Sequence, residues 1–379
     1  MNKMKRIFSL VLVLTMVLGS FGSVFAAADV ETAEKTLTAV PKDVIGTEYE
    51  KAISRLVAFG IVEGYKDGTY KPENDVTRAE FAKIIVEALG IGNATKAAQG
   101  KTNFSDVPAT HWASGYINVA TGQGLLKGYP DGTFKPSAKV SYAEAMTMLV
   151  RSLGYQDEFL KGSWPGNYVA KAAEAGISSG VRFDDAGRFA NRGDVANLVN
   201  NALDADVVKV ETYKDGTVEY KESEKTLLKD KLDISKYEDT RILADKIVDD
   251  GLEEDEVTVR FLKDIDKKDE SVKKSYDEGD KKDFRFKNSA NPRKFVGEEV
   301  TVYMDDKDNV VYIESENDDR AYFDYIEAVE AKDGEVEEVS LVRFDKDYKF
   351  AEDAKVYVFD SSDNQYVELD AKDGSIDVN

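Results

Sequence analysis

Apolar side chains recur at helical spacing in three stretches of the first half of the chain. They fall at positions i, i+3, i+4, i+7 and i+8, which places them on one face of an α-helix. The pattern therefore predicts three amphipathic helices, each with one buried face. The three stripes, apolar apart from one serine, are Phe81, Ile84, Ile85, Ala88 and Leu89; Ala145, Met148, Leu149, Ser152 and Leu153; and Val195, Leu198, Val199, Ala202 and Leu203.

A helix-start signal precedes each stripe. A hydroxyl or amide side chain followed three residues later by an acidic residue is typical of a capping box, in which the two side chains satisfy exposed backbone donors. We therefore expect one helix to begin at each of these signals. The pairs are Thr77 with Glu80, Ser141 with Glu144 and, more weakly, Asn191 with Asp194.

A turn motif repeats before these helices: GYKDGTYKP at 64–72 and GYPDGTFKP at 128–136. Asp-Gly-Thr is turn chemistry, and the following Lys-Pro stops a helix from continuing. A further helix is expected before each turn, near 47–59, 112–122 and 165–175. Each unit is thus a helix, a turn and a helix, and is too small for a good core alone, so we expect the three units to pack together.

These motifs resemble the S-layer homology (SLH) repeat. The family pattern is a Phe-x-Asp-Val start with a Trp, the Gly-Tyr-x-Asp-Gly-Thr turn, and a Thr-Arg-Ala-Glu helix start. The second copy has Phe104–Val107, and the first copy has Val40–Val44 at that place, with Tyr49 nearby. The resemblance implies an all-α pseudo-trimer of three repeats at 40–95, 100–155 and 160–204, the third degenerate.

The resemblance also implies binding of secondary cell-wall polysaccharide, often pyruvylated. The motif Arg would meet the anionic sugar, and its planar fork suits a carboxylate. It is also expected beside unpaired backbone donors and the positive dipole end of its helix. In the second copy a Tyr takes the Arg position. The residues assigned to polysaccharide binding are Arg78, Arg192, Trp112, Trp164, Gly64, Gly128, Gly180 and Tyr142.

Structural alternatives stand beside these assignments. Arg78 and Arg192 are also explained as solvated residues at helix starts. Trp112 and Trp164 both open helices that must pack, which favours burial in the core. The lone His111 is expected to be a surface residue at a helix start rather than a catalytic base.

Charge divides the chain near residue 205. The whole net charge of −22 lies in 205–379, where 29 Lys and Arg face 51 Asp and Glu, whereas the two signs balance before it. The acidic character argues against nucleic acid as a partner. Strand and hairpin patterns replace helices here, for example at 299–304 and 310–314. We expect two small β-rich domains, 205–315 and 320–379, and hence an α+β multidomain chain.

Further strands are expected in this acidic half. Residues 207–213 and 217–221 flank Lys-Asp-Gly and predict a second hairpin, and strands are also expected at 335–344, 355–359 and 365–369. The highly charged stretch 263–287 is predicted to be a mobile loop.

The first residues resemble a secretory signal. Lys3, Lys5 and Arg6 precede an apolar stretch at 7–18, and small residues allow cleavage after Ala26, which predicts a signal peptide at 1–26. The alternative is a retained membrane helix, but the stretch is shorter than the roughly 20 residues that a span requires. We expect a secreted protein of the bacterial cell wall or S-layer, with no transmembrane anchor after cleavage. The chain has no cysteine, which excludes disulfides and thiol chemistry.

The sequence offers little catalytic chemistry, so no enzyme activity and no cofactor are predicted. Asp305, Asp306 and Asp308 have the hard oxygens that calcium prefers, against the alternative of an acidic hairpin turn. The leading interpretation is non-covalent anchoring to wall polysaccharide, with the acidic half as a structural or surface-layer part that self-associates. The alternatives are a wall-anchored scaffold for partner proteins and an SLH-anchored enzyme.

Overall fold

The computed structural model describes residues 40–316 apart from short gaps at 158–159, 213–217, 247–248, 250, 269–270, 288–289 and 291, and six strands beyond residue 316. The predicted signal peptide and the segments between those last strands lie outside the described residues. No helix in the described part is both long enough and apolar enough to cross a bilayer.

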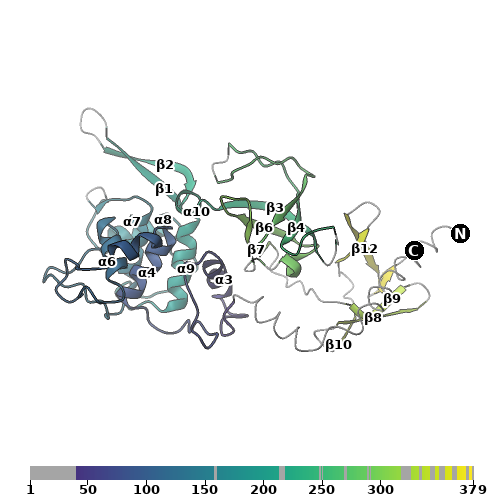
Figure 1. Cartoon of the computed structure of the whole chain (residues 1–379), viewed down its shortest axis with the longest axis horizontal. Coiled ribbons are helices and arrows are strands. Elements are labelled where there is room, and N and C mark those ends of the chain that lie inside the picture. The colour runs from purple at the N-terminus through teal and green to yellow at the C-terminus, as the bar shows by residue number, and fades with distance from the viewer. Residues whose placement is uncertain are drawn as a thin grey trace.

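Three helical units occupy one end of the described molecule (Figure 1). Each has a first helix, a turn segment and a second helix, as the sequence predicts. Short helical turns, η1 (Gly92–Ala94) and α5 (Thr95–Ala98), follow the first unit and had no clear sequence signal. The units comprise α3 (Glu50–Ala58) with α4 (Arg78–Ala88), α6 (Ser114–Gly122) with α7 (Tyr142–Ser152), and α8 (Gly166–Glu174) with α9 (Arg192–Leu203).

The predicted helix starts are confirmed. Thr77 and Ser141 both form complete capping boxes with the glutamate three residues on. Asn191 accepts a hydrogen bond from the backbone N–H of Asp194 at 2.7 Å, which is a cap without the reciprocal bond. The predicted apolar stripes are buried in one core that all three units share.

A closed cycle of backbone hydrogen bonds joins the three units at their centre. The N–H of Val76 donates to the carbonyl of Ala190 at 3.3 Å, Ala190 donates to Val140 at 3.0 Å, and Val140 donates back to Val76 at 2.8 Å. All three residues are fully buried. Each unit is thus bonded to both others, and buried backbone groups that would otherwise lack partners are satisfied.

The helical core continues beyond α9. A two-stranded antiparallel ribbon, β1 (Asp206–Thr212) and β2 (Val218–Thr226), projects from the bundle and confirms the hairpin predicted at 207–221 (Figure 1). The chain then returns through α10 (Leu227–Leu232), which the sequence analysis missed. Leu227 and Leu228 are buried in the core of the helical units.

A five-stranded antiparallel sheet follows, in the order β5-β4-β3-β6-β7. It contains the predicted 299–314 hairpin and has its own core around Tyr237, Phe261 and Val302. The prediction of a mobile loop over 263–287 is wrong in its described part. Tyr276 stacks on Phe261 at 3.9 Å and β5 lies within the segment, because buried aromatics alternate with its charges. The strands are β3 (Ser235–Asp245), β4 (Glu256–Phe261), β5 (Lys281–Arg285), β6 (Glu299–Met304) and β7 (Val310–Ser315).

The last six strands form a separate antiparallel sheet, in which β10-β9-β13-β12-β11 are neighbours and β8 also pairs with β9. Strands predicted at 335–344, 355–359 and 365–369 are confirmed as elements. The described bounds are β8 (Ile326–Lys332), β9 (Glu335–Leu341), β10 (Lys346–Lys349), β11 (Lys355–Asp360), β12 (Gln365–Lys372) and β13 (Ser375–Asp377).

Asp157 joins the second and third units and makes acid stability testable. Its carboxylate accepts hydrogen bonds from Lys127 (2.7 Å), Arg151 (2.9 Å) and the Tyr168 hydroxyl. Burial raises the pKa of Asp157, but these three donors outweigh burial and lower the pKa from 3.8 to about 2. Because the folded-state pKa is depressed, the stabilisation is present above about pH 4 and is lost as pH falls towards about 2.

We therefore expect Asp157→Asn to be less stable than the wild type at pH 6, with the difference shrinking as pH falls from about 4 to about 2. Urea unfolding of both proteins across this range is the measurement. Asp184→Asn, at an exposed ion pair with Arg188, is the matched control and should change stability little. Parallel curves for wild type and Asp157→Asn at all pH values would contradict this role.

Candidate polysaccharide-binding sites

The repeated turns are built alike in the first and second units. In each, an aspartate from the segment before the first helix accepts two backbone N–H bonds: Asp43 from Tyr70 and Lys71, and Asp106 from Phe134 and Lys135, all at 2.7–2.8 Å. These bonds hold Lys71 and Lys135 at φ near +57°, which a non-glycine residue adopts only when its surroundings impose it. The changed start motif of the first unit therefore keeps its essential aspartate.

The second helix of each unit begins against the turn segment of the next unit. Arg78 donates its backbone N–H to Ala138 at 2.8 Å, and Arg192 donates to Asn74 at 2.7 Å. The next residues along, Ala79 and Gly193, donate to Pro136 and Pro72. The expectation of unpaired backbone donors beside these arginines is therefore wrong, because the neighbouring unit supplies carbonyl acceptors.

Arg78 lies in what we call the second site, with Tyr129 and Lys135. Its guanidinium is between the rings of Tyr129 and Phe134, with Cζ 4.8 Å from each centroid, and its side chain donates to the Phe134 carbonyl at 2.9 Å. It also forms an ion pair with Glu144 at 2.6 Å. With 6% of the residue exposed, Arg78 is neutralised and largely enclosed.

Arg192 occupies the equivalent first site, with Tyr65 and Lys71. It donates to the Tyr70 carbonyl at 2.9 Å, and its Cζ lies 5.2 Å from the Tyr65 centroid, while Lys71 Nζ lies 4.3 Å from the same ring. Among the described residues, no carboxylate pairs with Arg192. Glu80, the counterpart of Glu144, accepts hydrogen bonds from Thr77. Tyr65 is 41% exposed, so this site is open. Lys71 pairs with Asp67 at 3.3 Å, which leaves Arg192 as the cation of the site without a described carboxylate partner.

Tyr142 lies in the third site, where the sequence lacks the motif Arg. Its ring stacks on Phe183 with centroids 5.0 Å apart, and its hydroxyl donates to the Asp194 carboxylate. Burial and the nearby Asp194 charge raise the pKa of Tyr142. The tyrosine is buried and replaces the cation with an aromatic contact between units.

Two of the assigned glycines, Gly64 and Gly128, each lie in a turn beside the arginine of another unit. Arg78 bonds the Lys127 carbonyl next to Gly128 at 3.2 Å, and Arg192 lies 3.5 Å from the Glu63 carbonyl next to Gly64. A Cβ on Gly128 would lie 2.2 Å from the Phe104 ring, so this glycine is required by packing. Gly180, with φ of +73°, is required by its backbone conformation instead.

The two tryptophans are exposed, which corrects the expectation that both pack in the core. Trp112 is 53% exposed and Trp164 is 57% exposed. Trp164 donates its indole N–H to Thr147 at 3.0 Å, which fixes the ring on the surface. Each tryptophan lies two residues before the first helix of its unit. In the first unit the equivalent position, two residues before α3, is Glu48. The rings stay available to the apolar face of a sugar.

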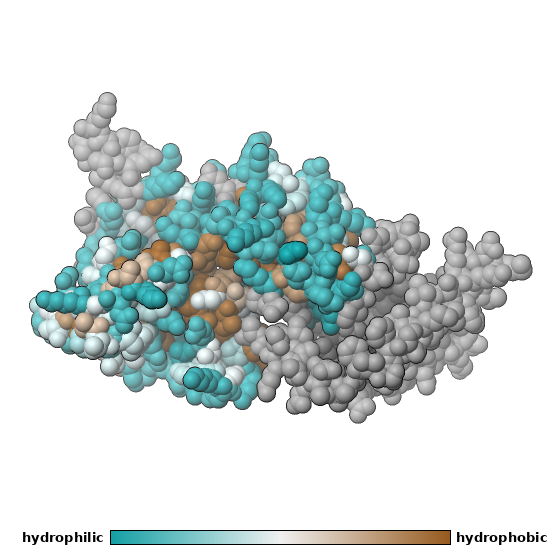
Figure 2. All heavy atoms as spheres, in the orientation of Figure 1, coloured by the Kyte–Doolittle hydropathy of each residue, from teal (hydrophilic) through white to brown (hydrophobic). Residues whose placement is uncertain are grey.

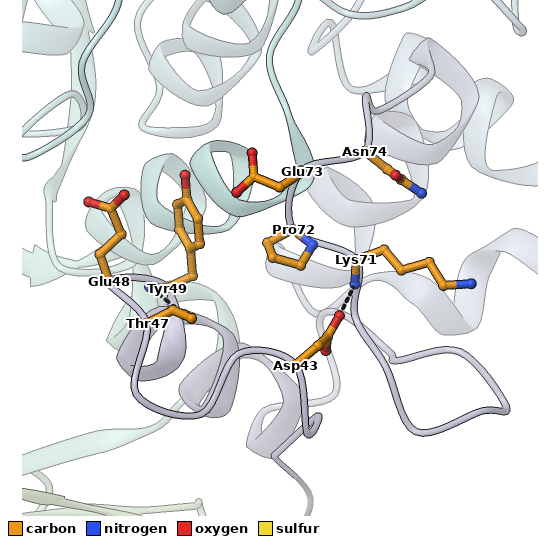
Figure 3. Close-up of a pocket in the computed structure, with 8 residues that line it drawn as sticks. All are labelled: Asp43, Thr47, Glu48, Tyr49, Lys71, Pro72, Glu73 and Asn74. Carbon is orange, nitrogen blue, oxygen red and sulfur yellow. Dashed lines mark hydrogen bonds between the residues drawn. The ribbon is translucent and has the colours of Figure 1, made fainter.

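A hollow of about 700 Å³ adjoins the first site and shares Lys71 with it. Figure 3 shows Glu48 and Tyr49 on one side and Pro72 and Glu73 on the other. Tyr49 packs on Gly193 of α9, where an added Cβ would lie 2.7 Å from the tyrosine ring. The residues that line the hollow all belong to the first unit, and the third unit contacts one of them, Tyr49, through Gly193. The lining residues are Asp43, Thr47, Glu48, Tyr49, Lys71, Pro72, Glu73 and Asn74.

The aspartates in the turn of the β6–β7 hairpin are paired with lysines from earlier segments of the chain. Asp305 pairs with Lys287 at 2.8 Å, and Asp308 pairs with Lys274 at 2.8 Å. No group of three or more potential ligands suited to a metal ion is found among the described residues. The calcium interpretation of Asp305, Asp306 and Asp308 therefore gains no support from the arrangement of these side chains.

Comparison with known families bears on what these units are. The family model for the S-layer homology domain matches residues 42–82 and 103–146, which lie in the first and second helical units. The chain is an SLH-domain bacterial surface protein. As such it is associated with the bacterial cell wall. The third unit of this SLH-domain protein lies outside the matched residues.

Three curated relatives extend the comparison. The SLH-domain protein is 38% identical over 206 residues to the "Middle cell wall protein" of Brevibacillus brevis, covering 54% of this chain and 19% of the relative. It is 31% identical to the "Surface layer protein" of Brevibacillus choshinensis, over 93% of this chain and 32% of the relative. It is 35% identical over 128 residues to the "Cellulosome-anchoring protein" of Acetivibrio thermocellus, over 33% of this chain and 28% of the relative. The chain therefore spans a third or less of each relative.

Proposed function

We propose that the three helical units are three SLH repeats arranged as a pseudo-trimer that anchors the chain to an anionic, pyruvylated wall polysaccharide. The closed hydrogen-bond cycle and the equivalent docking of each second helix on the next turn support the arrangement. The third repeat is the divergent one. It contributes Arg192 to the first site, although its own turn lacks the repeated motif.

The first site is the principal binding groove in this proposal. The observation that carries it is the open Arg192 guanidinium, which no described carboxylate neutralises and which shares the Tyr65 ring with Lys71. A carboxylate of a pyruvyl ketal fits a forked cation, and the ketal methyl fits the exposed tyrosine face. The exposed rings of Trp112 and Trp164 offer additional sugar contacts.

Arg78 and Tyr142 have a mainly structural role in this proposal. The Arg78 side chain donates its hydrogen bonds to the Phe134 and Lys127 carbonyls and to Glu144, and the Tyr142 hydroxyl donates to Asp194. Gly64, Gly128 and Gly180 shape the turns that carry the sites. The chain therefore has one strong groove rather than three equal ones.

We also propose that the acidic β half is a surface-layer or structural part of the protein. The alignment with the relative named a surface layer protein covers 93% of this chain and so includes the β strands. Its high negative charge keeps this half soluble and limits contact with other anionic polymers.

The test is co-sedimentation of the full chain with purified wall sacculi, before and after mild removal of pyruvyl groups. We expect strong binding to untreated sacculi and at least about tenfold weaker binding after removal, because the charge-assisted bonds to Arg192 are lost. Sacculi whose attached polysaccharide has been extracted serve as the control. Equal binding to treated and untreated sacculi would reject pyruvyl recognition, and no binding to either would reject the anchoring function.

A further inference from the structure

Helices α3 and α9 connect the first site with the five-stranded sheet. At their N-terminal ends lie Glu48 and Tyr49 of the hollow and Arg192 of the first site. At their C-terminal ends lie Phe59, which contacts Tyr303 with ring centroids 5.8 Å apart, and the C-cap residue Asp204. At 1.5 Å per residue, α9 spans about 18 Å between the two places. The same two helices thus carry both features.

Arg55 of α3 is the centre of the contact with the sheet. Only 2% of it is exposed, and its guanidinium donates twice to Asp204, at 2.7 and 2.6 Å. Its Cζ lies 4.7 Å from the ring centroid of Tyr303 on β6 and 5.5 Å from that of Phe59. A guanidinium with a bidentate partner and two aromatic faces has little freedom to move.

Apolar contacts surround this cation. Tyr303 of β6 and Val311 of β7 belong to the same buried core as the helical units. Tyr312 packs edge-on against Phe59, with centroids 6.1 Å apart, and Lys51 forms an ion pair with Glu314 at the rim. In Figure 2, hydrophobic residues gather in the middle of the visible face, with hydrophilic residues around them. Sheet and helices therefore share one core at this contact.

The connection between the two parts is also fixed. The N–H of Leu227 in α10 bonds the Ala205 carbonyl at 2.9 Å, which returns the chain to the end of α9 after the ribbon. The end of α10 also packs against the turn that follows α4, where a Cβ on Gly90 would lie 2.7 Å from the Lys231 carbonyl. Short, packed connections of this kind differ from the exposed polar linkers that separate mobile domains.

Among the three units, the first has the side chains for this contact. Arg55 is the sixth residue of α3, and the sixth residues of α6 and α8 are Val119 and Lys171. Valine has no charge for a bidentate pair, and Lys171 pairs with Glu174 of its own helix. Of the three first helices, α3 is therefore the one whose side chains suit contact with the sheet.

We propose that the helical units and the five-stranded sheet form one rigid body, with Arg55 as the positioning residue, and that the sheet is held in a fixed direction from the first site. The rigidity is independent of the glycan. Only the statement that this direction is set relative to the wall rests on the proposed function. A glycan bound at the N-terminal ends of α3 and α9 then orients the sheet at their other ends.

The absence of cysteine from the sequence makes a distance measurement direct. Spin labels at introduced Lys96→Cys, on α5, and Lys282→Cys, on β5, report the separation of the two parts by pulsed EPR in the full chain. Both positions are exposed. We expect one narrow distance distribution. Arg55→Met should widen it about twofold, because removing the central cation frees the sheet to move as an ordinary domain.

Lys171→Met is the matched control, since it removes the same charge at the equivalent position of α8, and it should leave the width unchanged. If Arg55→Met does not fold, as judged by circular dichroism, Asp204→Asn weakens the same contact and takes its place. A broad distribution in the wild type, or an unchanged width in the folded variant, would overturn the proposal. Loss of sacculus binding with a narrow distribution would reject the proposed function alone.

Discussion

Replacement of Arg192 by Gln is expected to weaken binding of the folded protein to purified wall polysaccharide by about ten- to a hundredfold. A hydrogen bond to a charged group contributes about 1.5–3 kcal/mol, and each 1.4 kcal/mol is a factor of ten. Because Arg192 is partly exposed and bonds mainly the Tyr70 carbonyl, stability should fall little. Isothermal titration with the isolated polysaccharide measures the effect.

Two further variants sharpen this result. Arg192→Lys keeps the charge but loses the fork, so its affinity should lie between those of the wild type and Arg192→Gln. Arg188→Gln removes the same charge from an exposed ion pair with Asp184, and it should bind as the wild type does. Equal losses in Arg192→Gln and Arg188→Gln would mean that net charge, rather than the first site, determines binding.

Replacement of Arg78 by Met is expected to cost about 3 kcal/mol of unfolding free energy, because it breaks an enclosed ion pair and leaves Glu144 without its cation. The Phe134 and Lys127 carbonyls also lose their donor. Urea unfolding followed by circular dichroism measures this loss. The fraction that remains folded should bind polysaccharide with nearly unchanged affinity, since Arg78 lies in the closed second site.

Arg188→Met is the matched control for stability and should leave the unfolding free energy nearly unchanged, as expected for an exposed ion pair. An Arg78→Met protein with wild-type stability and lost binding would reverse the roles assigned to the first and second sites. Loss of both properties in the folded protein would indicate that the two sites act together.

Local features of the helical half were predictable from sequence. The capping boxes at Thr77 and Ser141 and the apolar stripes depend on residues three or four positions apart, so the sequence contains all the partners that they need. The turn motif likewise indicates its own conformation. Hairpins were predicted for the same reason, because their partners are close along the chain.

Contacts between units were not predictable in this way. The acceptors for the Arg78 side chain lie 49–66 residues away, and Arg192 bonds a carbonyl 122 residues away. Sequence therefore assigns both arginines to polysaccharide binding, whereas the ion pair with Glu144 distinguishes Arg78 from Arg192. The exposure of Trp112 and Trp164 and the partner of Arg55 depend on the same long-range packing. One such contact has a signal in the sequence. Gly193 stands where the other two second helices have alanine, and the missing methyl makes room for the Tyr49 ring of the first unit.

The closed ring of Val76, Val140 and Ala190 limits how this bundle is able to evolve. In open repeat arrays each unit touches only its neighbours, so units are gained or lost singly. Here Val76 both donates the first bond of the ring and accepts the last, so the three units close on one another. Removing one unit leaves a buried N–H on one remaining unit and a buried carbonyl on the other without partners. We therefore expect the three repeats to be gained or lost together. Within that set, a single repeat is free to diverge, as the third has done, provided that its backbone closes the ring.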